Sequence, residues 1–121
     1  IQYLQFGKSE GATSAYLDSA SGVTSGQDNG YVMMRVGSIT GISTSVIILS
    51  GDGKLSIKIY KNGQDTGFEN LISSKDKKKL DYDIQSEEII TYEPGDILSV
   101  YVEQIGEINW SRMTTMVETI S

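Results

Sequence analysis

The sequence contains no cysteine and no histidine among its 121 residues. Without cysteine the chain can form neither a disulfide framework nor a thiolate zinc site. Without histidine it lacks the commonest general base, the commonest zinc ligand and the side chain that titrates nearest to neutral pH. We therefore expect no cofactor and no enzymatic activity.

Charge and hydropathy exclude further classes of partner. Ten basic against sixteen acidic residues give a formal net charge of −6, which disfavours a nucleic-acid backbone. No apolar run approaches the roughly 18 residues that cross a bilayer, so we expect no membrane insertion. The length fits one domain over residues 1–121, with a loop-rich segment at 1–30 and a core at 31–121.

The residues that are present favour β-structure. Thirteen glycines, a single proline and abundant Ser and Thr suit an all-β chain with many tight turns. Residues 7–30, rich in Gly, Ser, Asp and Asn, are predicted as a long loop. The predicted strands are residues 1–6, 31–36, 39–50, 54–60, 67–73, 80–84, 88–92, 97–104 and 110–120. Eight or nine strands separated by regular turn signals predict an antiparallel β-sandwich, jelly-roll-like in its architecture.

Several turns have recognisable chemistry. Gly51-Asp52-Gly53 and Asn62-Gly63 are predicted as hairpin turns. Residues 93–96, Glu-Pro-Gly-Asp, place Pro and Gly as a type II turn requires. Residues 106–109 are predicted to reverse the chain, and residues 74–79 to form a solvated tip.

Two segments carry apolar residues on both strand faces, unlike the strictly alternating strand 54–60, in which Leu55, Ile57 and Ile59 face inward. They are residues 46–49, Val-Ile-Ile-Leu, and residues 110–120. A two-layer domain covers only one face of each sheet, so the second face predicts a neighbouring subunit. The residues predicted at this interface are Val46, Ile47, Ile48, Leu49, Met113, Met116 and Val117.

Two arrangements of polar residues are candidates for chemistry. Asp81 and Asp83, with Glu88 nearby, supply the paired carboxylates of a glycoside hydrolase, but no apolar pocket marks a raised pKa. We interpret them as a solvated strand face, and a hydrolase is the least favoured alternative. Residues 62–73 place Gly67 at the sixth position of a calcium loop, but the loop begins with Asn, ends with Ser and is flanked by strands. No spacing requires a metal.

A second set of residues is a candidate for surface recognition. Lys75, Lys77, Lys78 and Lys79 form the one basic cluster, which either contacts an anionic surface or is a soluble turn that discourages edge-to-edge pairing. Trp110 and the seven tyrosines either stack on sugar rings or pack as core and cross-strand partners.

The order of several motifs resembles one known family. Residues 30–43 (GYVMMRVGSITGIS), Tyr60-Lys61-Asn62-Gly63 and residues 93–100 (EPGDILSV) resemble a pattern in small β domains of tailed-bacteriophage virion proteins. Residues 109–118 are similar to the last strand of those domains. Met34 stands where the family pattern has Pro, and the region of residues 75–92 is longer and more charged than in that pattern.

The resemblance implies a function but transfers no catalytic residue. Such domains occur on head fibres, decoration proteins and tail appendages, and often form trimers with a jelly-roll-like fold. It implies a homotrimeric structural or adhesive module on the virion surface, with other virion proteins as partners and a host-surface glycan as a further candidate. If the module is adhesive, contacts are expected from loops at residues 22–29, 63–68 or 75–79. The alternative is a carbohydrate-binding module of a bacterial secreted or surface protein, which would require Trp110 and two tyrosines on one open face.

Overall fold

The computed structural model describes all residues from 1 to 121 and shows nine strands joined in one antiparallel sheet. The strands are β1 (Gln2–Gly11), β2 (Ala15–Tyr16), β3 (Asp18–Ser19), β4 (Tyr31–Val32), β5 (Gly37–Lys61), β6 (Gln64–Ser73), β7 (Leu80–Ile84), β8 (Thr91–Tyr92) and β9 (Ile97–Ile120). The predicted all-β class is confirmed. The structure contains no helix that could cross a membrane.

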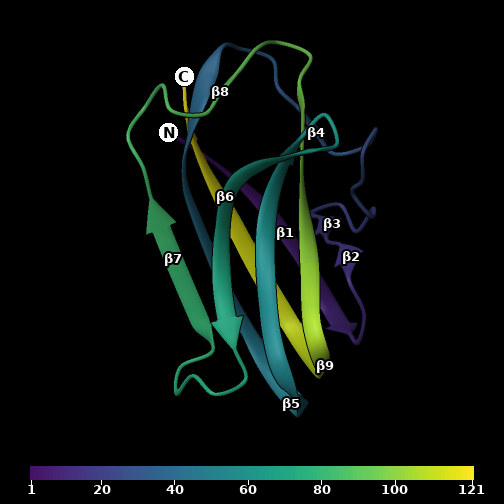
Figure 1. Ribbon diagram of the computed structural model, residues 1–121. Coiled ribbons are helices and arrows are strands. Elements are labelled where there is room, and N and C mark those ends of the chain that lie inside the picture. Colours follow the sequence, from purple (N-terminus) through teal and green to yellow (C-terminus); the bar gives the residue numbers. More distant parts are fainter.

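The two longest strands, β5 and β9, form a ribbon that folds back on itself. They pair from Ser38–Ile120 at one end to Lys61–Leu98 at the other. Straight strands of this length would extend about 80 Å. Instead the ribbon turns over at the lower end of Figure 1, and its two arms lie in two layers. The ribbon therefore builds both layers of the sandwich.

Each layer is completed by the strands that pair with one arm. In the front layer, β6 pairs with residues 54–61 of β5, and β2 and β4 pair with the first residues of β9. In the back layer, β7 and β8 pair with the first arm of β5, and β1 pairs with the last arm of β9. β3 extends the sheet beyond β1.

Glycines allow the ribbon to fold. Gly53 pairs with Gly106 at the bend, and the φ angles of Gly51 and Gly106 are +101° and +89°. The backbones approach so closely that a Cβ atom on Gly51 would lie 2.8 Å from the Cα of Ile108. The hairpin predicted at 51–53 and the reversal predicted at 106–109 are wrong, because both strands continue through these residues. Glycine with positive φ serves a strand bend as well as a hairpin tip.

The two other turn predictions are confirmed. Asn62 and Gly63, with φ angles of 53° and 78°, connect β5 to β6. At 93–96, Gly95 has a φ of 94° and the Asp96 amide donates to the Glu93 carbonyl over 3.1 Å. Such tight turns depend only on their own residues.

Strand extents differ from the predictions in four places, the smallest being β6, which begins at Gln64 rather than at residue 67. β1 continues to Gly11 along β9, so the loop predicted at 7–30 is shorter and contains β2 and β3. The strands predicted at 31–36 and 88–92 are reduced to the two-residue strands β4 and β8. Both segments are rich in residues that favour β-structure, but only two residues of each lie beside a strand with which they can pair.

The core lies between the two layers. The alternation of the front layer is confirmed, because Leu55, Ile57 and Ile59 are fully buried. The other buried apolar side chains are Phe6, Leu17, Met33, Ile39, Ile42, Val46, Ile72, Tyr92, Leu98, Val100, Val102, Ile108, Trp110, Met113 and Val117.

A β-bulge explains the mixed faces of the last strand. Trp110 and Met113 are both buried although they have opposite parity in the sequence. Between them Arg112 has a φ of 52°, and the register of β9 against β5 shifts by one residue. An extra residue moves every later side chain to the other face. The side chains after Arg112 therefore alternate normally between the core and the outer face. The mixed parity of the sequence does not require apolar contacts on both faces of the strand.

Candidate interaction surface

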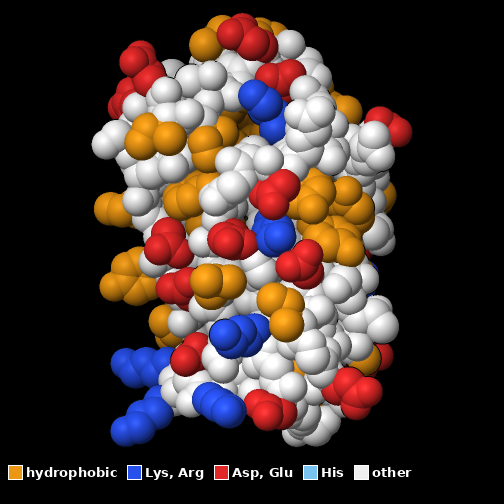
Figure 2. Space-filling model, in the orientation of Figure 1, with side chains coloured by type: hydrophobic (Ala, Val, Ile, Leu, Met, Phe, Trp, Pro, Cys, Tyr) orange, Lys and Arg blue, Asp and Glu red, His pale blue; other side chains and the backbone are white.

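The outer face of the back layer exposes a group of apolar side chains. They come from β5, β7 and β9, with exposed fractions from 38% at Met116 to 82% at Ile84. We call this group the apolar face, and it consists of Ile47, Leu49, Leu80, Tyr82, Ile84 and Met116. Figure 2 shows hydrophobic side chains protruding along the left edge, where Figure 1 places β7.

Strand alternation puts these side chains on one side. In β5, Val46 is buried whereas Ile47 and Leu49 point outward. In β7, Tyr82 pairs with Ser43 and Leu80 with Ser45, so the even-numbered residues of β7 share the outer side with the odd-numbered residues of β5. β7 is an edge strand, because its only ladder partner is β5.

Small residues between the apolar side chains leave open grooves. One groove of about 290 Å³ lies between Tyr82 and Met116, with Ser45 and Thr114 in its wall. A second of about 100 Å³ continues toward Ile84. Ridges of apolar side chains beside such grooves can interdigitate with a complementary protein surface.

The predicted interface residues divide into two groups. Ile47, Leu49 and Met116 are exposed, and Ile48 is half-buried. The prediction is wrong for three others, which the single chain already buries and which a partner cannot reach: Val46, Met113 and Val117.

Sequence reasoning missed the contribution of β7. The segment Leu80-Asp81-Tyr82-Asp83-Ile84 alternates strictly, so its three apolar residues share one face. The alternation is visible in the sequence, but it is equally typical of a strand whose apolar face packs against the core. Only the position of β7 at the sheet edge leaves this face open.

The recognition residues also divide. Lys75, Lys77 and Lys78 are exposed in the turn between β6 and β7, the corner at lower left where Figure 2 shows cationic side chains gathered. Lys79 is half-buried, and its Nζ donates to the Ser74 carbonyl over 2.9 Å. Trp110 is 1% exposed, so its predicted role in surface recognition is wrong.

The paired carboxylates Asp81 and Asp83 form hydrogen bonds between the two layers, from β7 to β6. Asp81 Oδ2 accepts from the backbone amide of Leu71, and Asp83 Oδ2 from Asn70 Nδ2, each over 2.9 Å. Asn70 is fully buried and donates also to the Ile42 carbonyl over 3.3 Å. Asp83 is exposed and Asp81 half-buried, so this strand face is solvated as predicted, but both carboxylates also connect β7 to β6.

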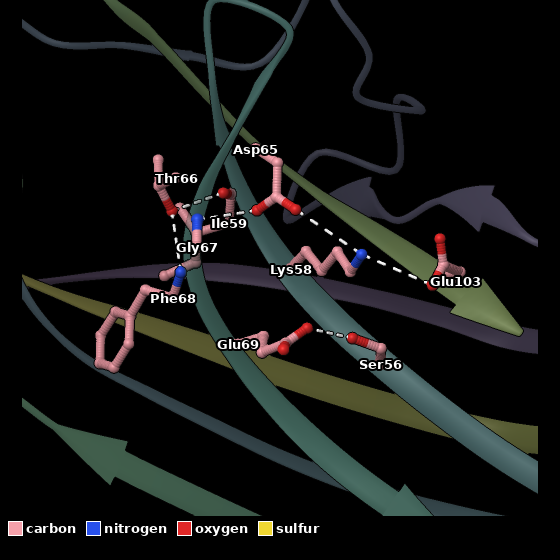
Figure 3. A network of polar contacts seen from close by, with 9 residues as sticks. All are labelled: Ser56, Lys58, Ile59, Asp65, Thr66, Gly67, Phe68, Glu69 and Glu103. Atoms are coloured by element: carbon pink, nitrogen blue, oxygen red, sulfur yellow. Dashed lines mark hydrogen bonds and ion pairs between the residues drawn. The ribbon is translucent and has the colours of Figure 1, made fainter.

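The polar side chains of the candidate calcium loop accept hydrogen bonds from backbone amides around the β5–β6 turn. Asn62 Oδ1 accepts from the amide of Ile97 over 2.9 Å. Asp65 Oδ1 accepts from the amide of Gly67 over 2.8 Å, as Figure 3 shows. No three His, Cys, Asp or Glu side chains come together in a way that could hold a metal ion.

A second polar feature lies on the outer face of the front layer. Lys58 Nζ lies 3.5 Å from Glu103 and 3.6 Å from Asp65, so one ammonium bridges two carboxylates (Figure 3). Burial lowers the pKa of Lys58, but the charges of Glu103, Asp65 and Glu69 outweigh it and hold that pKa above its ordinary value. Lys58 therefore stays charged at neutral pH.

Three half-buried tyrosines lie beside this ion pair. Tyr16 packs edge-on against Tyr60 and Tyr101, with ring centroids 5.8 and 4.9 Å apart and interplanar angles of 85° and 69°. Burial, with Asp65 nearby, raises the pKa of the Tyr60 hydroxyl. Tyr60 and Tyr101 are tilted by 36° to each other and Tyr16 stands edge-on to both, so the three rings form no single coplanar platform.

Compared with protein-family models and with curated proteins, the chain matches none.

Proposed function

We propose that this chain is a non-enzymatic structural module of the surface of a tailed-bacteriophage particle, and that it assembles as a homotrimer through its apolar face. The single observation that carries the proposal is the apolar face itself. An exposed group of large apolar side chains on a folded domain marks an interaction site more often than a free surface. The resemblance of residues 30–120 to virion appendage domains supports both the location on a phage particle and the trimeric assembly.

The size of the face fits a stable interface. A standard protein interface buries about 800 Å² on each partner, which is roughly one eighth of the 6695 Å² of accessible surface here. One face of a small sandwich supplies such an area. The remaining surface, including the exposed lysines of the β6–β7 turn, is then free for other virion proteins or a host-surface glycan.

Light scattering on a size-exclusion column tests the assembly. We expect the native chain to elute with a mass of about 40 kDa, three times the 13.2 kDa of one chain. The double variant Tyr82→Ser/Ile84→Ser should elute as a monomer. The matched control is Leu71→Ser/Ile105→Ser, which removes two apolar side chains that are 57% and 51% exposed outside the apolar face and should keep the native mass.

Two outcomes would overturn the proposal. One is a native mass of one chain at every concentration, which would mean that the apolar face has no copy of itself as partner. The other is equal dissociation of both double variants, which would place the interface elsewhere.

The alternative, a carbohydrate-binding module, has one supporting observation. Tyr16, Tyr60 and Tyr101 share a half-exposed cluster beside Lys58, and sugars bind to aromatic rings with polar groups next to them. Two observations disfavour it: Trp110 is buried, and Tyr16 stands edge-on to the other two rings. Chemical shifts of the tyrosine rings during titration with oligosaccharides test it. Saturable shifts that Tyr101→Ala abolishes would favour this alternative over the structural module.

A further inference from the structure

A cleft of about 440 Å³ opens at the end of the sandwich that carries both chain ends. Figure 1 shows this end, where β4, β8 and the two termini lie together. Seven of its ten lining residues are hydrophobic, and the whole set is Gln2, Tyr3, Leu4, Tyr31, Val32, Met33, Met34, Arg35, Tyr92 and Ser121. The volume lies within the range of small-molecule sites, about 300 to 1,000 Å³.

The wall of the cleft is held rigidly by contacts outside it. The Tyr31 hydroxyl donates to the Gln5 carbonyl over 2.9 Å, and its ring packs edge-on against Phe6. The Met33 amide donates to the Asp96 carbonyl over 2.8 Å, and the Met33 carbonyl accepts from Gly95 over 2.7 Å. The cleft is therefore preformed, which lowers the entropic cost of binding.

One buried polar group in the lining has no partner. Tyr92 is 1% exposed, and its hydroxyl makes no hydrogen bond within the chain. Buried hydroxyls are almost always paired, so an unpaired one needs an explanation. The hydroxyl itself is enclosed and lies beside Gly37 and the Ile120 carbonyl, so Tyr92 presents its ring rather than its hydroxyl to the cleft.

One cation at the rim is also unpaired. Arg35 is exposed and makes no ion pair or side-chain hydrogen bond, although the chain carries sixteen carboxylate side chains. Arginine binds carboxylate, sulfonate and phosphate groups through parallel hydrogen bonds. A free guanidinium beside an apolar cleft is complementary to a molecule with an apolar body and an anionic head.

We propose that this cleft binds a small amphipathic anion, whose acyl or aromatic body lies against Leu4, Met33 and Tyr92 and whose acidic group is held by Arg35. The cleft shares Tyr3 with the groove that runs toward Ile84, but none of the residues that define the apolar face lines it, and it does not depend on the assembly proposed above. Its ligand chemistry follows from the apolar lining and the unpaired guanidinium of Arg35.

Fluorescence titration with 1-anilinonaphthalene-8-sulfonate tests the proposal, because this probe combines an aromatic body with an anion. We expect saturable binding to the native chain with one site. Arg35→Gln should raise the dissociation constant about tenfold, since it removes a charge-assisted contact. The matched control Lys77→Gln makes the same change of charge at an exposed position outside the cleft and should leave the constant unchanged.

A second pair of variants separates the cleft from the apolar face. Met34→Ser changes an 83% exposed residue of the cleft lining, and Leu49→Ser a 62% exposed residue of the apolar face. We expect Met34→Ser to weaken probe binding and Leu49→Ser to leave it unchanged. Both residues are too exposed for either change to prevent folding.

Competition defines the class of ligand. Decanoate should displace the probe at lower concentration than decanol, because only decanoate carries the anion that Arg35 recognises. The proposal is overturned if no saturable binding occurs, if Arg35→Gln binds as tightly as Lys77→Gln, or if Leu49→Ser weakens binding instead of Met34→Ser. Equal displacement by decanoate and decanol would also overturn it.

Discussion

Alanine at Gly51 should destabilise the protein far more than alanine at two other glycines. Gly26 has ordinary φ and free space for a Cβ atom, and Gly67 has a φ of +83° with equally free space. Gly51 has a φ of +101°, and a Cβ atom there would meet the backbone of Glu107 and lie 2.8 Å from the Cα of Ile108. The three sites separate the cost of the dihedral angle from the cost of the contact.

The magnitudes follow from these geometries. Gly26→Ala should be neutral or stabilise by up to about 1 kcal/mol, because alanine restricts the unfolded chain. Gly67→Ala should cost about 1 kcal/mol, since the left-handed conformation costs roughly 1–2 kcal/mol and the unfolded-state effect offsets part of it. Gly51→Ala adds a clash with backbone that the β5–β9 ladder holds in place, so we expect about 3 kcal/mol or more.

Urea unfolding followed by tryptophan fluorescence measures the differences. Trp110 is the only tryptophan and is 1% exposed, so its emission reports exposure of the core. All variants are compared at one protein concentration, because self-association would stabilise the folded state. In a thermal scan, 3 kcal/mol corresponds to roughly 12 °C for a domain of this size. If Gly51→Ala loses no more stability than Gly67→Ala, the close backbone approach at the bend is refuted, and a free hairpin tip at residues 51–53 is favoured.

Two further predictions concern the core and one turn. Val117→Ala should lower the free energy of unfolding in urea by about 2–3 kcal/mol, because it leaves a cavity in the core. The neighbouring Met116→Ala should change it by less than about 0.5 kcal/mol when measured in the monomeric Tyr82→Ser/Ile84→Ser background. Equal effects of the two substitutions would contradict the assignment of Val117 to the core and Met116 to the outer face. The Asp96 carboxylate accepts from the Glu93 amide and from Asn62, and these bonds hold its pKa below the ordinary value. Its stabilising contribution is present above the unfolded-state pKa, about 3.9, and is lost as pH falls through the lower folded-state pKa. Asp96→Asn should therefore be less stable than the native chain at pH 7, with the difference shrinking in acid; a difference independent of pH would contradict this linkage.

Local chemistry could be predicted from the sequence. The strict alternation of residues 54–60 predicts the inward side chains of the front layer, and the structure confirms it. The turns at Asn62-Gly63 and at residues 93–96 were predicted for the same reason: their conformation depends on a few adjacent residues. Half of the apolar face could also be anticipated: Ile47, Leu49 and Met116 lie in segments that carry apolar residues on both parities.

The sequence by itself determined that this protein is an all-β sandwich with defined tight turns, because strand propensity, alternation and turn chemistry act over a few residues. Only the tertiary structure decided that residues 51–53 bend a continuous ribbon, and that a bulge at Arg112 turns Met113 and Val117 into the core. Only the tertiary structure likewise left β7 at an edge and brought Arg35 beside the chain ends to complete the cleft. A glycine with positive φ fits a hairpin and a bend equally, and a face is covered or open according to strands far away in the sequence. These outcomes depend on long-range pairing, which local patterns do not encode.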